Sequence, residues 1–237
     1  MAKKRGSGSA DIGSRRSPAV RLKAARRLSP SSKHWLERQL NDPYVGEARA
    51  RGYRSRAAFK LIQLDERFHL LRPGMRVVDL GCAPGGWTQV AVERVDPKPG
   101  KGTVVGIDLL ATDAIPGSAF IQLDFLDPDA PARIKALLAG PADLVMSDMA
   151  APTTGHAATD HLRIVALAEA AYAFAAEVLA PGGTFVAKVF QGGATGELLA
   201  ALKRDFATVR HAKPPASRSE SAEMYVIAIG FRGDLSG

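Results

Sequence analysis

From residue 76 onward, short apolar segments alternate with longer stretches of helical spacing, and this alternation restricts the chain to few folds. The apolar segments that we expect to be strands are 76–80, 103–109, 119–123, 143–147 and 184–190. The intervening stretches that we expect to be helices are 87–95, 130–138, 159–179 and 196–206. Strands that are separated by helices pair in parallel, so the pattern predicts an α/β protein with a doubly wound sheet.

Both ends of this pattern carry further elements. Two segments, 34–41 and 55–70, have helical spacing and precede the first strand. Two more apolar segments, 208–212 and 224–231, follow the last helix and have no helix between them. Strands connected without a crossover helix pair antiparallel. The sequence therefore predicts a seven-stranded, mostly parallel sheet whose last strand is antiparallel.

The positive charge of the chain is concentrated at its N-terminus. The formal net charge is +8, and residues 1–33 hold ten Lys or Arg against the single acid Asp11, which leaves 22 bases and 23 acids elsewhere. Residues 1–32 are rich in Ser and Gly and contain few large apolar residues, so we expect a disordered arm followed by one folded domain, 33–237. A basic arm on a nearly neutral domain favours a polyanionic partner, and a solubilising tail is the alternative.

Composition also limits the setting in which the protein works. No apolar stretch follows the charges of residues 1–9, as a secretory signal would require, so we expect a cytoplasmic protein. The most apolar long segment, 164–179, carries two glutamates and is too short to cross a bilayer. The single cysteine, Cys82, excludes an internal disulfide and a cysteine zinc cluster. No heptad repeat is present, which favours a monomer.

Ligand-binding features follow the first three predicted strands. The first runs into the glycine-rich turn DLGCAPGGW, 79–87, where Pro84 removes an amide donor and disfavours the pyrophosphate site of a dinucleotide. The second ends at Asp108, which can accept hydrogen bonds from a ribose diol. The third is followed by Asp124 and Phe125, a carboxylate and a ring suited to adenine. Each acid alone could be a cap or turn residue, but acids at three consecutive strand ends predict an adenosine and methionine site.

Six segments of the chain together resemble the FtsJ/RrmJ (RlmE) family of ribose 2′-O-methyltransferases. They are DLGCAPGGWTQ, GIDLL, LDF, DLVMSDMA, FVAKVFQG and KPPASRSESAEMYVIAIGF, and the resemblance covers about residues 33–232. It implies a Rossmann-like methyltransferase fold with S-adenosylmethionine as the cofactor. With the strand-end analysis, it gives the expected cofactor-binding residues as Asp79, Gly81, Pro84, Gly85, Gly86, Trp87, Asp108, Leu109, Asp124, Phe125 and Asp148.

The resemblance also implies a catalytic Lys-Asp-Lys-Glu tetrad, which matches Lys60, Asp148, Lys188 and Glu223. Lys188 is unusual even without the family, because it lies within a strand that we expect to be buried. We expect Lys188 at the attacking ribose oxygen, either as a neutral base or as a cation that stabilises the alkoxide, with Asp148 orienting it. Lys60 and Glu223 are expected to hold the ribose and its protons. The displacement depends on positioning of the reactants and needs no metal.

The resemblance favours ribosomal RNA of the large subunit (23S) as the substrate, with a uridine in the peptidyl-transferase region as the target. Transfer RNA or messenger caps, with the same chemistry, remain alternatives. A second alternative is a non-catalytic cofactor-binding factor for ribosome assembly, which the complete tetrad disfavours. A third is a nicotinamide-dependent oxidoreductase, which Pro84 and Lys188 disfavour.

Two features beside the predicted site concern RNA binding. Residues 149–152, MAAP, replace the Ala-Pro-Asn that commonly follows the family's aspartate, so the loop beside the methyl donor is expected to differ in shape. Before Lys60, four arginines flank Tyr53 and predict a phosphate-tracking groove with one stacking ring, unless they are only exposed helix charges. These arginines are Arg49, Arg51, Arg54 and Arg56.

Overall fold

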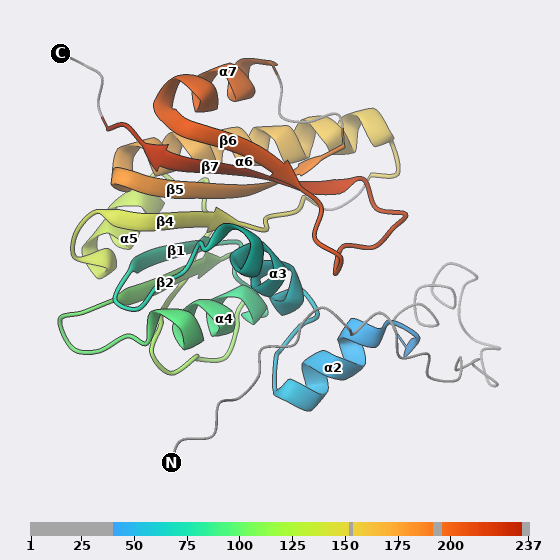
Figure 1. Cartoon of the computed structure of the whole chain (residues 1–237), viewed down its shortest axis with the longest axis horizontal. Helices are drawn as coiled ribbons and strands as arrows, with labels where there is room; N and C mark the ends of the chain where they lie inside the picture. Colours follow the sequence, from blue (N-terminus) through green and yellow to red (C-terminus); the bar gives the residue numbers. More distant parts are fainter. Residues whose placement is uncertain (1–39, 152–153, 192–195, 234–237) are drawn as a thin grey trace.

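The computed structural model describes residues 40–151, 154–191 and 196–233, and seven strands within them form one sheet (Figure 1). The strand order is β3-β2-β1-β4-β5-β7-β6. The strands β1 to β5 pair in parallel, whereas β7 is antiparallel to both of its neighbours, β5 and β6. The predicted sheet with its antiparallel last strand is thereby confirmed. The strands are β1 (Arg76–Leu80), β2 (Thr103–Asp108), β3 (Ala119–Gln122), β4 (Ala142–Ser147), β5 (Leu179–Phe190), β6 (Phe206–Ala212) and β7 (Glu223–Phe231).

Of the six described helices, α3 to α7 flank the sheet and α2 packs against α3, and none of the six is long and apolar enough to cross a membrane. The predicted helix 55–70 is shorter in the structure, and the predicted arm and most of the predicted helix 34–41 lie outside the described residues. The helices are α2 (Pro43–Arg51), α3 (Ala58–Phe68), α4 (Gly86–Val95), α5 (Ala130–Leu138), α6 (Ala157–Val178) and α7 (Gly196–Asp205).

The helix α2 was not predicted from the sequence, although its ends carry clear signals. The side chain of Asp42 accepts a hydrogen bond from the Tyr44 amide, and Pro43 occupies the first helical position. At the other end Gly52, with φ 78°, closes the helix in the left-handed conformation. Tyr44 and Ala48 are buried against α3. The helix α2 therefore packs against α3 and leads into the link 52–57, which precedes α3 and Lys60.

Alternate side chains of the strands point into two separate cores. Val78 and Leu80 of β1 belong to the core that includes residues of α5, α6 and α7, whereas Val77 of the same strand belongs to the core that includes residues of α2, α3 and α4. In Figure 1, α3 and α4 lie in front of the sheet, and α5 and α6 lie behind it. The period of two in the strands thus builds three layers, as expected for a doubly wound sheet.

One edge of the sheet gathers the functional candidates. Because β1 to β5 are parallel, their carboxyl ends share this edge, which is where open α/β sheets bind ligands. The antiparallel β7 begins there instead of ending there, and its first residue, Glu223, pairs with Phe190 at the end of β5. Reversal of the last strand therefore brings Glu223 to the strand ends that carry the predicted acids.

Candidate active site

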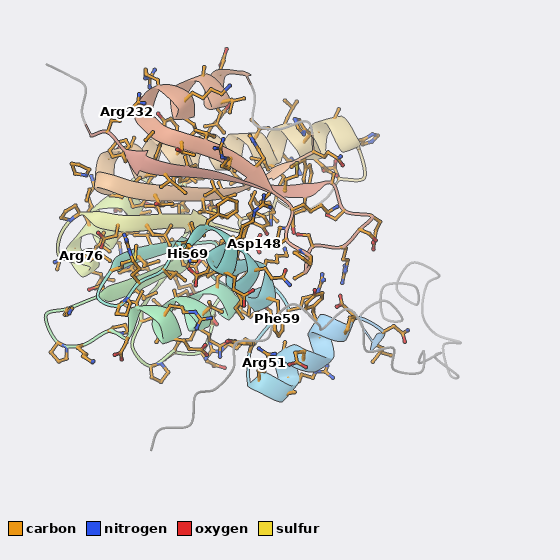
Figure 2. All side chains as sticks on the ribbon, in the orientation of Figure 1. Arg51, Phe59, His69, Arg76, Asp148 and Arg232 are labelled. Carbon is orange, nitrogen blue, oxygen red and sulfur yellow. The ribbon has the colours of Figure 1, made fainter. Side chains whose placement is uncertain are left out.

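The four residues of the predicted tetrad lie together at this edge, with Asp148 near the centre of the molecule (Figure 2). Lys188 Nζ donates to Asp148 Oδ1 at 3.0 Å and to the Asp148 backbone oxygen at 2.7 Å. Lys60 Nζ lies 3.6 Å from Asp148 Oδ2 and donates to Glu223 Oε2 at 2.7 Å. The side chains form a row of alternating charge, Lys188, Asp148, Lys60 and Glu223, drawn from four different elements or their ends.

Both lysines are buried, each with 8% of its surface exposed. Lys60 lies in the first turn of α3, and Lys188 follows Val186 by two residues on β5, so Lys188 faces the layer of α3 and α4. An ammonium group in such a place requires an anionic partner, which Asp148 supplies to both lysines. Asp148 takes two of the three positions on the Lys188 nitrogen. Among the described residues, one position is left for a ligand, as a donor if the lysine is charged and as a lone pair if it is neutral.

Tyr225 is a functional candidate that the sequence reasoning missed. Its hydroxyl donates to Asp148 Oδ1 at 2.7 Å, and it pairs with Lys188 across β5 and β7. The ring is fully buried, with the Trp87 ring 5.5 Å away and Lys60 Nζ 5.8 Å from its centroid. Strand periodicity could have identified Tyr225. It follows Glu223 by two residues on β7, so the two side chains lie on the same face of the strand.

Electrostatics keep Asp148 ionised. Burial by itself would raise the pKa of this carboxyl, but Lys188 and Lys60, with the hydrogen bond from Tyr225, outweigh it and hold the pKa below its usual value. Burial, together with the charges of Asp148 and Glu223, raises the pKa of Tyr225 well above 10. Tyr225 therefore remains protonated and serves as a donor to the aspartate, which in turn fixes the Lys188 nitrogen.

The predicted cofactor residues begin with Asp79, which is fully buried near the end of β1. Its Oδ2 accepts from Thr88 Oγ1 at 2.6 Å, while its Oδ1 is buried and has no hydrogen-bond partner in the described part of the chain. Burial, aided by the charges of Asp148 and Asp108, raises the pKa of Asp79 to about 7, against the effect of the Thr88 bond. An acid placed in this way fits a ligand that carries a cation, such as the ammonium group of a methionine.

The turn after β1 is close-packed where two glycines adopt positive φ. Gly81 has φ 74° and Gly85 has φ 109°, and a Cβ atom on Gly85 would lie 2.6 Å from Ile115. Gly85 is the N-cap of α4 and provides no side-chain cap, and Gly86 is the first residue of the helix. The amide groups at this helix N-terminus thus suit an anionic group such as the carboxylate of a methionine.

Asp108 connects the loops that follow β1 and β2. Its Oδ2 accepts from the Ala83 amide and its Oδ1 from the Leu110 amide, each at 2.8 Å. Each oxygen keeps a second lone pair, so the ribose-diol role predicted for this residue is compatible with its bonds. Leu109 follows β2 with 64% of its surface exposed, because the strand ends one residue earlier than predicted.

The residues after β3 occupy the same edge. Asp124 is exposed and accepts from the Leu126 amide at 3.0 Å, while the Phe125 ring packs edge-on against Phe174 at 5.7 Å. One side of the ring therefore belongs to the core. Their predicted contacts with adenine stay predictions.

Two predicted cofactor residues, Trp87 and Pro84, form hydrogen bonds that connect the segments around the site. The Trp87 indole has 3% of its surface exposed, and its Nε1 donates to the Ala57 backbone oxygen at 2.9 Å. It therefore fastens α4 to the entry of α3, and only its backbone remains a candidate for cofactor contact. The carbonyl of Pro84 accepts from Thr112 Oγ1 at 3.0 Å, which fastens the turn to the loop after β2.

The predicted groove with a stacking ring stays a prediction, and Tyr53 and Arg54 have partners within the fold. The Tyr53 hydroxyl donates to Glu93, and its ring lies edge-on to Phe59 at 5.8 Å. The Arg54 guanidinium is engaged by backbone oxygens of the loops after β1 and β2. Both side chains are thus used within the fold, by partners that sequence spacing did not reveal. Arg49 is exposed, and Arg51 pairs with Glu47 on the surface of α2.

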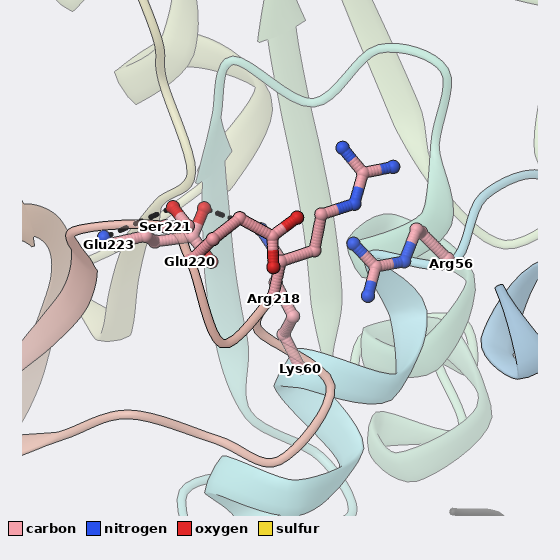
Figure 3. Close-up of a pocket in the computed structure, with 6 residues that line it drawn as sticks. All are labelled: Arg56, Lys60, Arg218, Glu220, Ser221 and Glu223. Carbon is pink, nitrogen blue, oxygen red and sulfur yellow. Dashed lines mark hydrogen bonds and ion pairs between the residues drawn. The ribbon is translucent and has the colours of Figure 1, made fainter. Parts of the chain in front are cut away.

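A pocket lies directly beside the tetrad (Figure 3). The guanidinium groups of Arg56 and Arg218 share one carboxylate there, since their Nε atoms lie 2.8 Å and 3.8 Å from Asp42 Oδ2. The pocket also holds the ion pair of Lys60 and Glu223 and the carboxylate of Glu220, so its acids and bases balance, and the two guanidinium groups are its candidates for contact with an anionic group such as an RNA phosphate. The pocket is lined by Arg56, Lys60, Arg218, Glu220, Ser221 and Glu223.

Comparison with known proteins agrees with this geometry. Residues 53–231 match the model of the FtsJ-like methyltransferase family. A relative from Paramagnetospirillum magneticum, named ribosomal RNA large subunit methyltransferase E, is 65% identical over 232 residues, which are 97% of this chain and 95% of the relative. The protein of the same name from Azorhizobium caulinodans is 64% identical over 214 residues, 90% of this chain and 89% of the relative.

A solved structure shares the fold. The crystal structure described as a ribosomal RNA methyltransferase from Plasmodium falciparum is 33% identical, with a TM-score of 0.68, and covers 76% of this chain and 100% of its own. The likeness thus extends from the motifs to the three-dimensional arrangement of the sheet.

Proposed function

The chain belongs to the FtsJ-like methyltransferase family, and we propose that it transfers the methyl group of S-adenosylmethionine to a ribose 2′-hydroxyl of large-subunit (23S) ribosomal RNA. The observation that carries this proposal is the buried row of Lys188, Asp148, Lys60 and Glu223 beside a pocket with two arginines. Such a row can hold a ribose hydroxyl and can either accept its proton or stabilise the negative charge of the alkoxide. The cofactor then occupies the adjacent strand ends.

Lys188 acts on the attacking oxygen. When bound, S-adenosylmethionine supplies a methyl group on a positively charged sulfur, so the oxygen–methyl bond forms as the sulfur–methyl bond breaks. The hydroxyl proton passes to Lys188 if its amine is neutral. If the lysine is charged, its ammonium group stabilises the forming alkoxide and the proton leaves to water. In both cases Asp148 fixes the lysine nitrogen through two hydrogen bonds, and Lys60 and Glu223 hold the ribose.

The cofactor is held by the turn after β1 and by the strand ends beside it. The α4 N-terminus at Gly85 and Gly86 suits the methionine carboxylate, and Asp79 complements its ammonium group. Asp108 accepts from the ribose diol, and Asp124 with Phe125 recognises adenine. These assignments are supported by the orphaned oxygen of Asp79 and by the remaining lone pairs of Asp108.

The RNA strand enters through the pocket beside Lys60. Arg56 and Arg218 contact a phosphate near the target nucleotide, and this is supported by their place in the pocket beside Lys60, where the two guanidinium groups share one carboxylate. The basic arm, 1–32, belongs to the same interface and precedes a catalytic domain, 33–237. The protein works as a monomer in the cytoplasm on RNA destined for, or already within, the large ribosomal subunit.

The test is methyl transfer from radiolabelled S-adenosylmethionine to separate RNA classes, followed by mapping of ribose methylation. Large-subunit ribosomal RNA, as naked RNA or as assembled subunit, is expected to gain one ribose methyl group, and transfer RNA none. Lys188→Ala should abolish the transfer while S-adenosylhomocysteine affinity stays within a few-fold. A non-catalytic assembly factor would bind the cofactor and label no RNA, and labelled transfer RNA would reassign the substrate.

A further inference from the structure

Arg54 lies in the link between α2 and α3, and both terminal nitrogens of its guanidinium group donate to two loops. Its Nη1 donates to the backbone oxygen of Asp113 at 2.7 Å, to Thr112 Oγ1 at 3.2 Å and to the backbone oxygen of Pro84 at 3.4 Å. Its Nη2 donates to the backbone oxygen of Ala114 at 3.0 Å. These acceptors fix the orientation of the planar Arg54 guanidinium group.

These two loops bracket the proposed methyl-donor site. Pro84 belongs to the turn after β1, which leads from Asp79 to α4, and residues 112–114 belong to the loop after Asp108. Asp108 ties the loops together through the Ala83 amide on the strand side. Thr112 Oγ1 joins them again by donating to the Pro84 backbone oxygen, and Arg54 reinforces this connection because its Nη1 contacts both Pro84 and Thr112.

The contact between Arg54 and Gly85 shows that the arginine lies close to the proposed cofactor site. A Cβ atom on Gly85 would lie 3.1 Å from Arg54 Nη1 and 2.6 Å from Ile115. The arginine therefore packs against the residue that caps α4, which is the helix terminus proposed to receive the methionine carboxylate. The Arg54 amide also donates to Gln89 Oε1 of α4 at 2.8 Å, so the backbone at Arg54 is bonded directly to this helix.

We propose that Arg54 is a positioning residue for S-adenosylmethionine: its guanidinium clamps the loops after β1 and β2 at the spacing that the bound cofactor requires. The inference rests on the proposed function, since it concerns the methyl-donor site of that reaction. Without the clamp, the turn after β1 would keep its bonds to the end of β2 at Ile107 and Asp108, and the outer parts of the two loops would keep the Thr112 bond, so cofactor binding would have to order these outer parts. The clamp thus contributes to cofactor affinity and not to the chemical step or to phosphate binding.

The experiment is calorimetry with S-adenosylhomocysteine on the full-length protein and its variants. Arg54→Ala is expected to weaken binding about tenfold, because several charge-assisted bonds in the clamp are lost. Arg54→Lys keeps the charge but not the fork, so its affinity should be much closer to that of the alanine variant. Arg133→Ala, which removes an exposed arginine from α5, should match wild type.

Steady-state kinetics and RNA binding separate this role from a merely structural one. Arg54→Ala should raise the KM for S-adenosylmethionine about tenfold and leave kcat at saturating cofactor within twofold, with unchanged RNA affinity at saturating S-adenosylhomocysteine. Unchanged cofactor affinity in Arg54→Ala, with weakened RNA binding, would make Arg54 a phosphate ligand and overturn the proposal. Failure of the wild-type protein to bind S-adenosylhomocysteine would instead refute the proposed function.

Discussion

At the scale of the residue, the site is a set of buried charges that neutralise one another. Asp148 accepts from Lys188 and Tyr225 and lies 3.6 Å from Lys60, so a single carboxylate orders three neighbours. A network of this kind is expected to be sensitive to the loss of any one member, because each lost bond leaves a buried polar group unsatisfied.

Tyr225→Phe tests this network by removing one hydroxyl. Asp148 loses a donor and is held less firmly, so kcat is expected to fall about tenfold while S-adenosylhomocysteine affinity stays within twofold. Single-turnover methylation and calorimetry measure the two quantities. Tyr172→Phe is the matched control, because its hydroxyl donates to Asp205 in the other layer, and it should keep wild-type kcat. Equal rates in the two variants would remove Tyr225 from the site.

Asp79 predicts a dependence of stability on pH. Its pKa is about 7 in the folded protein, above the ordinary 3.8, so between about pH 4 and 7 the folded state keeps a proton that the unfolded chain has lost. This group therefore lowers the free energy of unfolding as the pH rises through that window. Asp148 acts in the opposite sense, because its pKa is lowered. The informative quantity is thus the difference between wild type and Asp79→Asn.

Urea denaturation at several pH values measures that difference. The stability of Asp79→Asn relative to wild type should increase from pH 4 to pH 7, and saturating S-adenosylhomocysteine should reduce the trend, since its ammonium group favours the ionised acid. A difference that is constant across the window would show that Asp79 is ionised throughout.

At the scale of the element, most of the sheet could be predicted and the helix before Lys60 could not. Apolar periodicity placed β1 and α5 at their observed bounds, because a strand buried on both faces is apolar throughout and a helix buried on one face repeats its apolar residues every four positions. α2 has only two buried apolar residues, Tyr44 and Ala48, and so lacks such a pattern. The roles of Arg54 and Tyr53 depend on residues 30 or more positions away, in the loop after β1 and in α4, which local spacing does not reveal.

Asp42 tests how α2 supports the pocket. It caps the helix through Oδ1, and its Oδ2 lies between Arg56 and Arg218. Asp42→Ala loses both functions, whereas Asp42→Asn keeps the cap, so the alanine variant should be less stable than the asparagine variant by about 1 kcal/mol. Urea denaturation measures this difference. Glu47→Ala, which breaks an exposed pair with Arg51 on the same helix, should cost less than about 0.5 kcal/mol. Equal stability of the two Asp42 variants would argue against the cap.

At the scale of the whole molecule, basic residues are concentrated in the N-terminal arm while the rest of the chain is nearly neutral. This distribution predicts that the arm adds RNA affinity without taking part in catalysis. Ten bases in residues 1–33 can neutralise several phosphates, each adding about 0.9 to the salt slope if the duplex-DNA rule applies to this RNA. Deletion of residues 1–30 should therefore weaken RNA binding and flatten its salt dependence. RNA affinity at several salt concentrations measures the effect.

The same deletion should leave cofactor affinity and the single-turnover rate at saturating RNA unchanged, because Lys60, Asp148, Lys188 and Glu223 all follow the deleted segment. Equal salt slopes for the full-length and shortened proteins would show that the arm does not contact RNA. A lost rate at saturation would place the arm in the active site.

The position of β7 also sets the order in which the protein becomes competent as it is synthesised. β6 pairs with β7 alone among the described strands, and β7 lies between β6 and β5, so this side of the sheet cannot close until the nine residues Glu223–Phe231 have left the ribosome. The strand ends proposed to bind the methyl donor are translated well before that point. A nascent chain stalled after β6 would thus carry the residues for the donor but neither Glu223 nor Tyr225, and would be unable to modify the particle that was making it.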